Sequence, residues 1–71
     1  MNCIIKETVD SLLESYPTLE LVKEVKKQVE GLLMIMNLAT PANEEGAKQK
    51  IRLEFVSHCL NIAEKVLLEE N

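Results

Sequence analysis

Apolar residues recur with a helical period in three segments of the chain, and proline ends the first two. In the segment 3–15 the apolar spacing of three and four predicts one short helix with a broad apolar face. Asn2 is a suitable N-cap for this helix. Pro17 ends it, because proline removes a backbone donor and disfavours helical geometry at Tyr16. The apolar positions of this segment are Ile4, Ile5, Val9, Leu12 and Leu13.

The segment 18–39 has the most regular pattern of the three. Thr18 is suited to cap its start, and Glu20 places a negative charge in the first turn, where it favours the helix dipole. Apolar residues then alternate at spacings of three and four, which is the a/d seam of a heptad pattern. We predict a long helix that packs along this seam. The seam positions are Val22, Val25, Val29, Leu32, Met36 and Ala39.

After Gly31 this second helix loses its polar face. Residues 32–36 are all apolar, and Leu38 and Ala39 follow after a single Asn37. A helix at the surface of a small domain needs only one apolar stripe. Because this end is apolar on every side, we expect it to contact more than one neighbour.

Pro41 breaks the second helix, and the residues around it form the predicted loop. Asn43 is the preferred N-cap of a third helix at about 44–69. The alternative is Thr40 as the cap with Pro41 at the first helical position, which would leave Gly46 inside the helix at a cost of about 1 kcal/mol.

The third helix carries a narrow polar stripe and is apolar over most of its remaining circumference. Such a helix must contact neighbours on more than one side. We therefore predict an all-α fold of three helices, with the two long helices antiparallel and the short one laid across them. The stripe consists of Lys50, Glu54, Ser57, Asn61 and Glu64. The apolar positions are Ile51, Leu53, Phe55, Val56, Cys59, Leu60, Ile62, Ala63, Val66 and Leu67.

The size of the chain favours association. Its 71 residues form a single predicted domain, 1–71, and a domain of this size buries only about 60% of its unfolded surface. Small folds without covalent or metal cross-links often oligomerise. Three helices do not easily cover two that are apolar over more than half of their girth, so we expect a helical-bundle homodimer. The predicted interface consists of Leu32, Leu33, Met36, Ala39, Phe55, Cys59, Ile62 and Val66.

Charge and cysteine content narrow the function classes. The net charge of -4 argues against broad binding to nucleic-acid phosphates. No secretory signal precedes the first charged residues, and the longest apolar run is shorter than the roughly 18 residues of a membrane span. We therefore expect a cytoplasmic protein. Cys3 and Cys59 lack CxxC spacing, so we expect small buried apolar residues and no disulfide or zinc pair.

His58 is the only histidine and the first position to consider for chemistry. Glu54 lies four residues before it, so the two side chains can meet on one helix face and share a hydrogen bond or a metal. A metal site needs further ligands, so we expect none. The segment also resembles histidine-phosphotransfer domains, in which an exposed helical histidine is followed by x-Leu-Lys-Gly. His58 and Leu60 match, whereas Asn61 and Ile62 occupy the Lys and Gly positions; the resemblance implies phosphotransfer through His58.

We expect neither a catalytic site nor a cofactor, because adjacent helical residues such as His58 and Cys59 point about 100° apart. The expected function is that of a small non-enzymatic regulatory or adaptor protein, acting through protein–protein interaction and homodimerisation. The alternative is a small nucleic-acid-associated regulator that uses Lys48, Lys50 and Arg52. A phosphotransfer or metal-binding module centred on His58 is ranked last.

Overall fold

The structure, a computed structural model, describes residues 2–38 and 43–70, and these contain three α-helices and no strand. The predicted all-α class and the three helices are confirmed. The first helix has the predicted bounds, the second begins one residue later, and the third ends one residue later. Ala39, the last residue of the predicted second helix, lies outside the described residues. The helices are α1 (Cys3–Ser15), α2 (Leu19–Leu38) and α3 (Glu44–Glu70).

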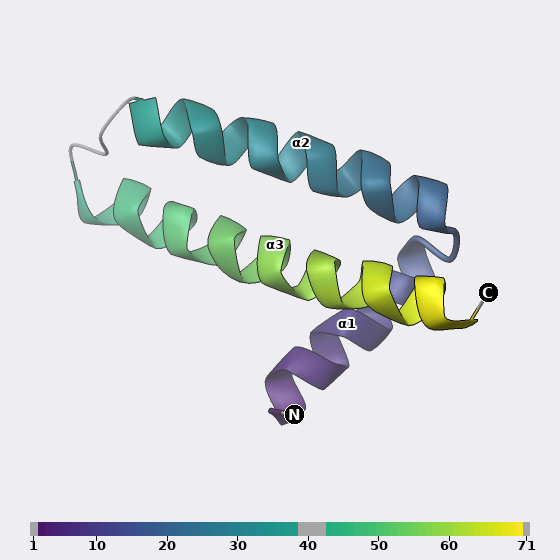
Figure 1. Cartoon of the computed structure of the whole chain (residues 1–71). Helices are drawn as coiled ribbons and strands as arrows, with labels where there is room; N and C mark the ends of the chain where they lie inside the picture. Colours follow the sequence, from purple (N-terminus) through teal and green to yellow (C-terminus); the bar gives the residue numbers. More distant parts are fainter. Residues whose placement is uncertain (1, 39–42, 71) are drawn as a thin grey trace.

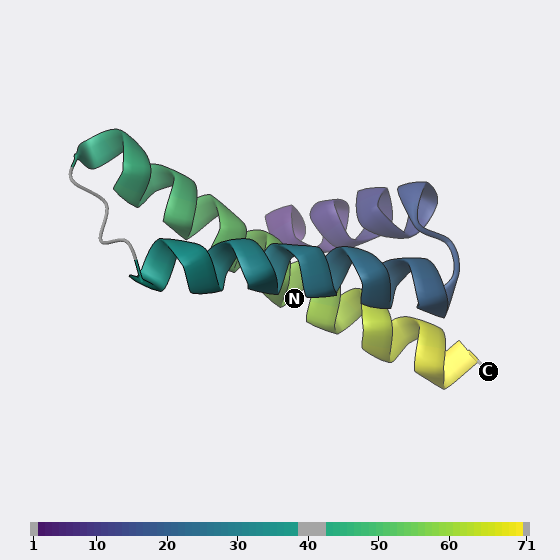
Figure 2. The ribbon, with the colours of Figure 1, turned by 90° about the horizontal axis from the view of Figure 1, so that it is seen from above.

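The two long helices, α2 and α3, form an antiparallel hairpin, as predicted (Figure 1). The short helix α1 packs mainly on α3 and crosses it at an angle near the C-terminal end of the hairpin (Figures 1 and 2). The C-terminus lies at the same end as the connection between α1 and α2. One end of the hairpin is therefore backed by a third helix, and the other end is a two-helix structure.

Each helix begins with a side-chain cap, as the sequence predicts. The side chains of Asn2 and Thr18 accept hydrogen bonds from backbone N–H groups in the first turns of α1 and α2, at 2.8 and 3.2 Å. The Asn43 Oδ1 accepts a hydrogen bond from the Gly46 N–H at 2.8 Å. Asn43 therefore caps α3, as preferred over Thr40, and Gly46 lies in the first turn.

We expect replacement of Asn43 with alanine to lower the free energy of unfolding by about 1 kcal/mol, because the Gly46 N–H loses its acceptor. Urea denaturation followed by circular dichroism measures this change. The matched control is Asn61→Ala, at an exposed position within α3, which should cost nothing because alanine is the better helix former. Equal losses in the two variants would contradict the capping role.

The core lies where α1 crosses the hairpin. Six residues are fully or almost fully buried: Val9, Val22, Val29, Cys59, Leu60 and Ala63. Partly buried apolar residues pack around them: Ile5, Leu12, Leu13, Tyr16, Val25, Leu33, Leu53, Phe55, Val56, Ile62 and Leu67. Among the described residues, none between 30 and 58 is fully buried. The other end of the hairpin therefore has only a partial interior.

The predicted a/d seam of α2 is wrong at one position. Leu33 packs against the core, whereas Leu32 is half-exposed. An α-helix has 3.6 residues per turn and drifts by about 20° per heptad relative to a 3.5-residue repeat. Leu33 therefore lies about three full turns after the buried Val22, so the two side chains project in nearly the same direction. The contact between α2 and α3 follows a straight helix rather than a coiled-coil seam.

The molecule is a thin slab with extents of 43 × 25 × 16 Å. Its radius of gyration is 13.2 Å, whereas a compact domain of this length has about 11 Å. Its accessible surface is 5277 Å², roughly 800 Å² more than the area of about 4,450 Å² that size scaling gives for a folded monomer of 8.0 kDa. The slab therefore exposes more surface than a closed small domain would.

Candidate functional site

The candidate site is the C-terminal end of α2, which we call the apolar end of α2 (Leu32–Leu38). Four of its large apolar side chains are exposed, with exposed fractions of 50% for Leu32, 65% for Met34, 62% for Ile35 and 83% for Leu38. Leu33 and Met36 are half-buried. None of the described helices is long and apolar enough to cross a membrane.

Three of the four exposed apolar residues of this end share one face. Successive helical residues lie about 100° apart, so Met34, Ile35 and Leu38 project away from the side of α2 that carries the buried valines. Gly31 lies on the same side, and a Cβ placed there would meet no atom within 4 Å. We call Gly31, Met34, Ile35 and Leu38 the outer face of α2. Glycine in a helix costs about 1 kcal/mol relative to alanine, and no contact within the chain requires it at this position.

The predicted interface residues of α3 are largely used within the chain. Phe55 and Ile62 are half-buried and pack against the core, and Val66 is also half-buried. Cys59 is completely buried among the chain's own helices, so it offers no surface to a partner. The short helix α1 therefore covers much of the apolar circumference of α3.

The predicted interface on α2 is distributed differently. Leu32 is exposed, Leu33 and Met36 are half-buried, and Ala39 lies outside the described residues. The exposed Met34, Ile35 and Leu38 are not among the predicted interface residues, because the seam pattern favours inward positions. The loss of polar residues after Gly31 is the feature of the sequence that indicates their exposure.

The two cysteines are free and lie in different environments. Cys3 is exposed at the start of α1, so its expected burial is wrong, whereas Cys59 is buried in the core as expected. Burial raises the pKa of the Cys59 thiol above its ordinary value, because the interior disfavours the charged thiolate. Cys59 is therefore a protonated packing residue at neutral pH, in keeping with its expected role as a small apolar side chain.

The predicted polar stripe of α3 does not face solvent along its whole length. Lys50, Ser57 and Glu64 are half-buried, whereas Glu54 and Asn61 are exposed. Residues spaced by seven share nearly the same direction on a helix. At Glu64 this direction points toward α2, and the Lys26 side chain of α2 approaches the Glu64 carboxylate. The stripe therefore lies at the edge of the contact between the two long helices.

The ion pair between Lys26 and Glu64 joins α2 to α3. The Lys26 Nζ donates a hydrogen bond to Glu64 Oε2 at 3.0 Å, and both side chains are partly buried. The two residues are 38 positions apart, so no local spacing in the sequence could identify the pair. It fixes the register of the hairpin beside the core.

We expect this pair to couple by about 0.5–1 kcal/mol, because both groups keep part of their hydration. A double-mutant cycle with Lys26→Met and Glu64→Gln, measured by urea denaturation, gives the coupling energy. High salt should reduce it. The matched control is Lys48 with Glu44, an exposed pair at 3.7 Å within one turn of α3. A coupling energy between Lys26 and Glu64 no larger than that between Lys48 and Glu44 would show that the pair does not stabilise the contact of α2 with α3.

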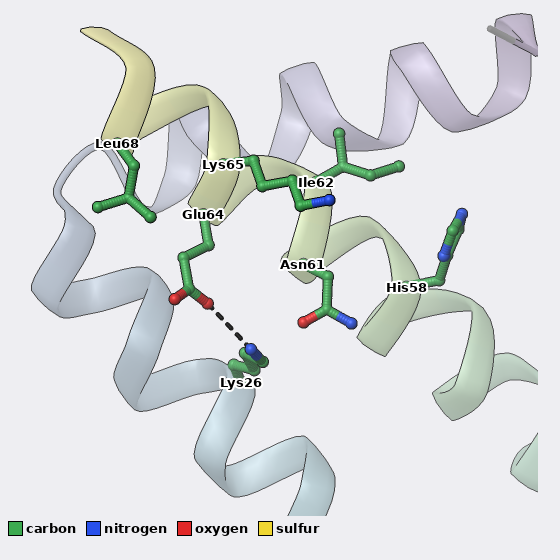
Figure 3. A pocket seen from close by; sticks show the side chains of 7 residues that line it. All are labelled: Lys26, His58, Asn61, Ile62, Glu64, Lys65 and Leu68. Atoms are coloured by element: carbon green, nitrogen blue, oxygen red, sulfur yellow. Dashed lines mark hydrogen bonds and ion pairs between the residues drawn. The ribbon is translucent and has the colours of Figure 1, made fainter. Parts of the chain in front are cut away.

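His58 is exposed and lies at the edge of a shallow hollow of about 480 Å³. In Figure 3, His58 and the Lys26–Glu64 pair lie on opposite sides of Asn61. The carboxylate in this hollow, Glu64, is bonded to Lys26 and not to His58. Within residues 2–38 and 43–70, no three His, Cys, Asp or Glu side chains lie close enough to hold a metal ion. The residues around the hollow are Lys26, His58, Asn61, Ile62, Glu64, Lys65 and Leu68.

The three basic residues of the alternative function do not share one face. Lys48 and Lys50 are separated by about 200° around the helix. Lys50 is half-buried, Arg52 is exposed, and the Lys48 Nζ lies 3.7 Å from Glu44 Oε1. A nucleic-acid backbone would therefore meet only part of this cluster at one time.

No protein-family model, curated protein or solved structure matches the chain.

Proposed function

We propose that the chain is a small non-enzymatic regulatory or adaptor protein that acts through protein–protein interaction and forms a homodimer. The apolar end of α2 carries this proposal. Four large apolar side chains within seven residues are at least half exposed there. Contiguous exposed apolar patches on soluble domains mark interaction surfaces, because water contact with such patches is unfavourable.

The shape of the slab gives independent support. The surface beyond that of an ordinary monomer of 8.0 kDa is roughly 800 Å². A stable interface of standard size buries about 800 Å² on each partner. A partner that covers the apolar end and its margins would therefore bring the exposed area to an ordinary value.

Sedimentation equilibrium at micromolar concentration tests the dimer. We expect a mass twice the 8.0 kDa of the chain, with dissociation on dilution. A mass of 8.0 kDa throughout the micromolar range would overturn the homodimer.

The adaptor role has its own test. We expect the wild-type chain and Leu68→Glu to capture the same host protein, and Ile35→Glu/Leu38→Glu to lose it. Leu68 is an exposed apolar residue near the C-terminus of α3, so it serves as a matched control. Equal capture by all three chains would show that capture of the host protein does not depend on the dimer that the apolar end forms.

A further inference from the structure

We infer that the apolar end of α2 docks on the same stretch of a second copy, with the two α2 helices antiparallel about a two-fold axis near Ile35. This inference rests on the proposed homodimer and specifies its surface and arrangement. The outer face of α2 is the centre of the contact. It is apolar, exposed and on the side of α2 away from the core.

The outer face complements itself in this arrangement. In an antiparallel pair related by a two-fold axis, residues at similar distances on either side of the axis lie opposite each other. Gly31 and Leu38 lie four residues before and three residues after Ile35. The partner's Leu38 therefore projects toward Gly31, which has open space around its Cα. Among the described residues, Leu38 is the large apolar side chain with the highest exposed fraction and Gly31 is the one exposed glycine in a helix, and this arrangement brings the two together.

Surface area favours a second copy as the occupant. The surface beyond that of an ordinary monomer, roughly 800 Å², equals one side of a standard interface. A two-fold contact buries the same apolar patch on both copies at once.

Charge around the apolar end is of both signs, which argues against a membrane surface as the occupant. Lys27 lies one turn before Gly31 on the outer side of α2, and the exposed Glu44 and Glu45 begin α3 beyond the other end of the patch. A membrane surface would instead favour basic residues around the patch, because lipid headgroups are often anionic.

Cysteine cross-linking tests the arrangement. In a Cys3→Ser background, which removes the exposed native thiol, we expect Ile35→Cys to form a disulfide-linked dimer under mild oxidation. Near the axis, the Cα atoms of two copies of one residue lie roughly 4.4–6.8 Å apart, which is the separation that a disulfide requires. Glu24→Cys is the matched control, because it lies on the same side of α2 but eleven residues from Ile35. We expect it to remain unlinked.

The outcomes separate the arrangement from the homodimer itself. If the wild type sediments as a dimer but Ile35→Cys does not link, or if Glu24→Cys links equally well, the antiparallel arrangement is overturned and the homodimer stands. If the wild type is a monomer, both are overturned. If a monomeric chain instead sediments with vesicles of anionic phospholipid, a lipid surface is the occupant and the inference is likewise overturned.

Replacement of Gly31 with glutamine is expected to change the stability of the monomer and the affinity of the dimer in opposite directions. No atom of the chain opposes a side chain at this position, so we expect the folding equilibrium constant of the dilute monomer to rise about threefold through helix propensity. The same side chain occupies the space of the partner's Leu38, so we expect the dimer dissociation constant to rise at least about tenfold. A dimer as tight as the wild type would overturn the contact at Gly31.

Discussion

Replacing Ile35 and Leu38 together with glutamate is expected to leave a folded chain that no longer dimerises. Both side chains are largely exposed and lie on the side of α2 away from the core. In the monomer the new carboxylates therefore stay in water. In the dimer four carboxylates would meet at the contact, and burying even one without a partner costs several kcal/mol. The dissociation constant should rise at least about a hundredfold.

Sedimentation equilibrium measures the association, and circular dichroism checks that the helices remain. Leu68→Glu is the control, because it places the same charge at another exposed leucine, near the opposite end of the hairpin. Met36→Glu is expected to impair both folding and association, because Met36 is half-buried. A double variant that dimerises like the wild type would show that the apolar end is not the interface.

Replacing Leu60 with alanine is expected to have the largest effect on stability. Leu60 is the largest of the fully buried side chains and lies in the core where α1 crosses the hairpin. Its truncation removes buried apolar surface and leaves a cavity, which costs about 2–5 kcal/mol. The total stability of small domains begins at about 5 kcal/mol. The stability that remains is about 0–3 kcal/mol, so up to about half of this variant should be unfolded at room temperature.

Thermal and urea denaturation followed by circular dichroism measure this loss. Leu68→Ala removes the same atoms from an exposed position of the same helix, so it should change the free energy of unfolding by about 0.5 kcal/mol or less. Similar losses in the two variants would mean that the core lies elsewhere.

The helices and their caps could be predicted from the sequence because both depend on local physical chemistry. Asn2, Thr18 and Asn43 each cap a helix through one side-chain oxygen, within three residues of the donor. The apolar period identified the segments between the caps. The choice between Leu32 and Leu33 depended on a drift of a fraction of a turn, and the heptad pattern chose the wrong residue.

Contacts between helices could be predicted only in part, because they depend on how the helices are rotated and where they cross. The stripe on α3 is predictable from its polarity, yet Ser57 and Glu64 are half-buried rather than in open solvent. At Glu64 the approach of α2 accounts for this, because Lys26 of α2 bonds to its carboxylate. Likewise, nothing in the spacing of Cys59 indicated that α1 would help to cover it. For the same reason, the exposure of the outer face of α2 could not be predicted from the seam positions.

The uneven placement of the core has a consequence for local opening. All six buried residues lie in the part of the bundle that α1 supports, and the described residues from 30 to 58 contribute none. Segments with few buried contacts open at a lower free energy than the whole domain unfolds. A partner that binds only the closed form of this end would stabilise it by mass action. Association and the last step of folding would then be one linked equilibrium, set by the concentration of the protein.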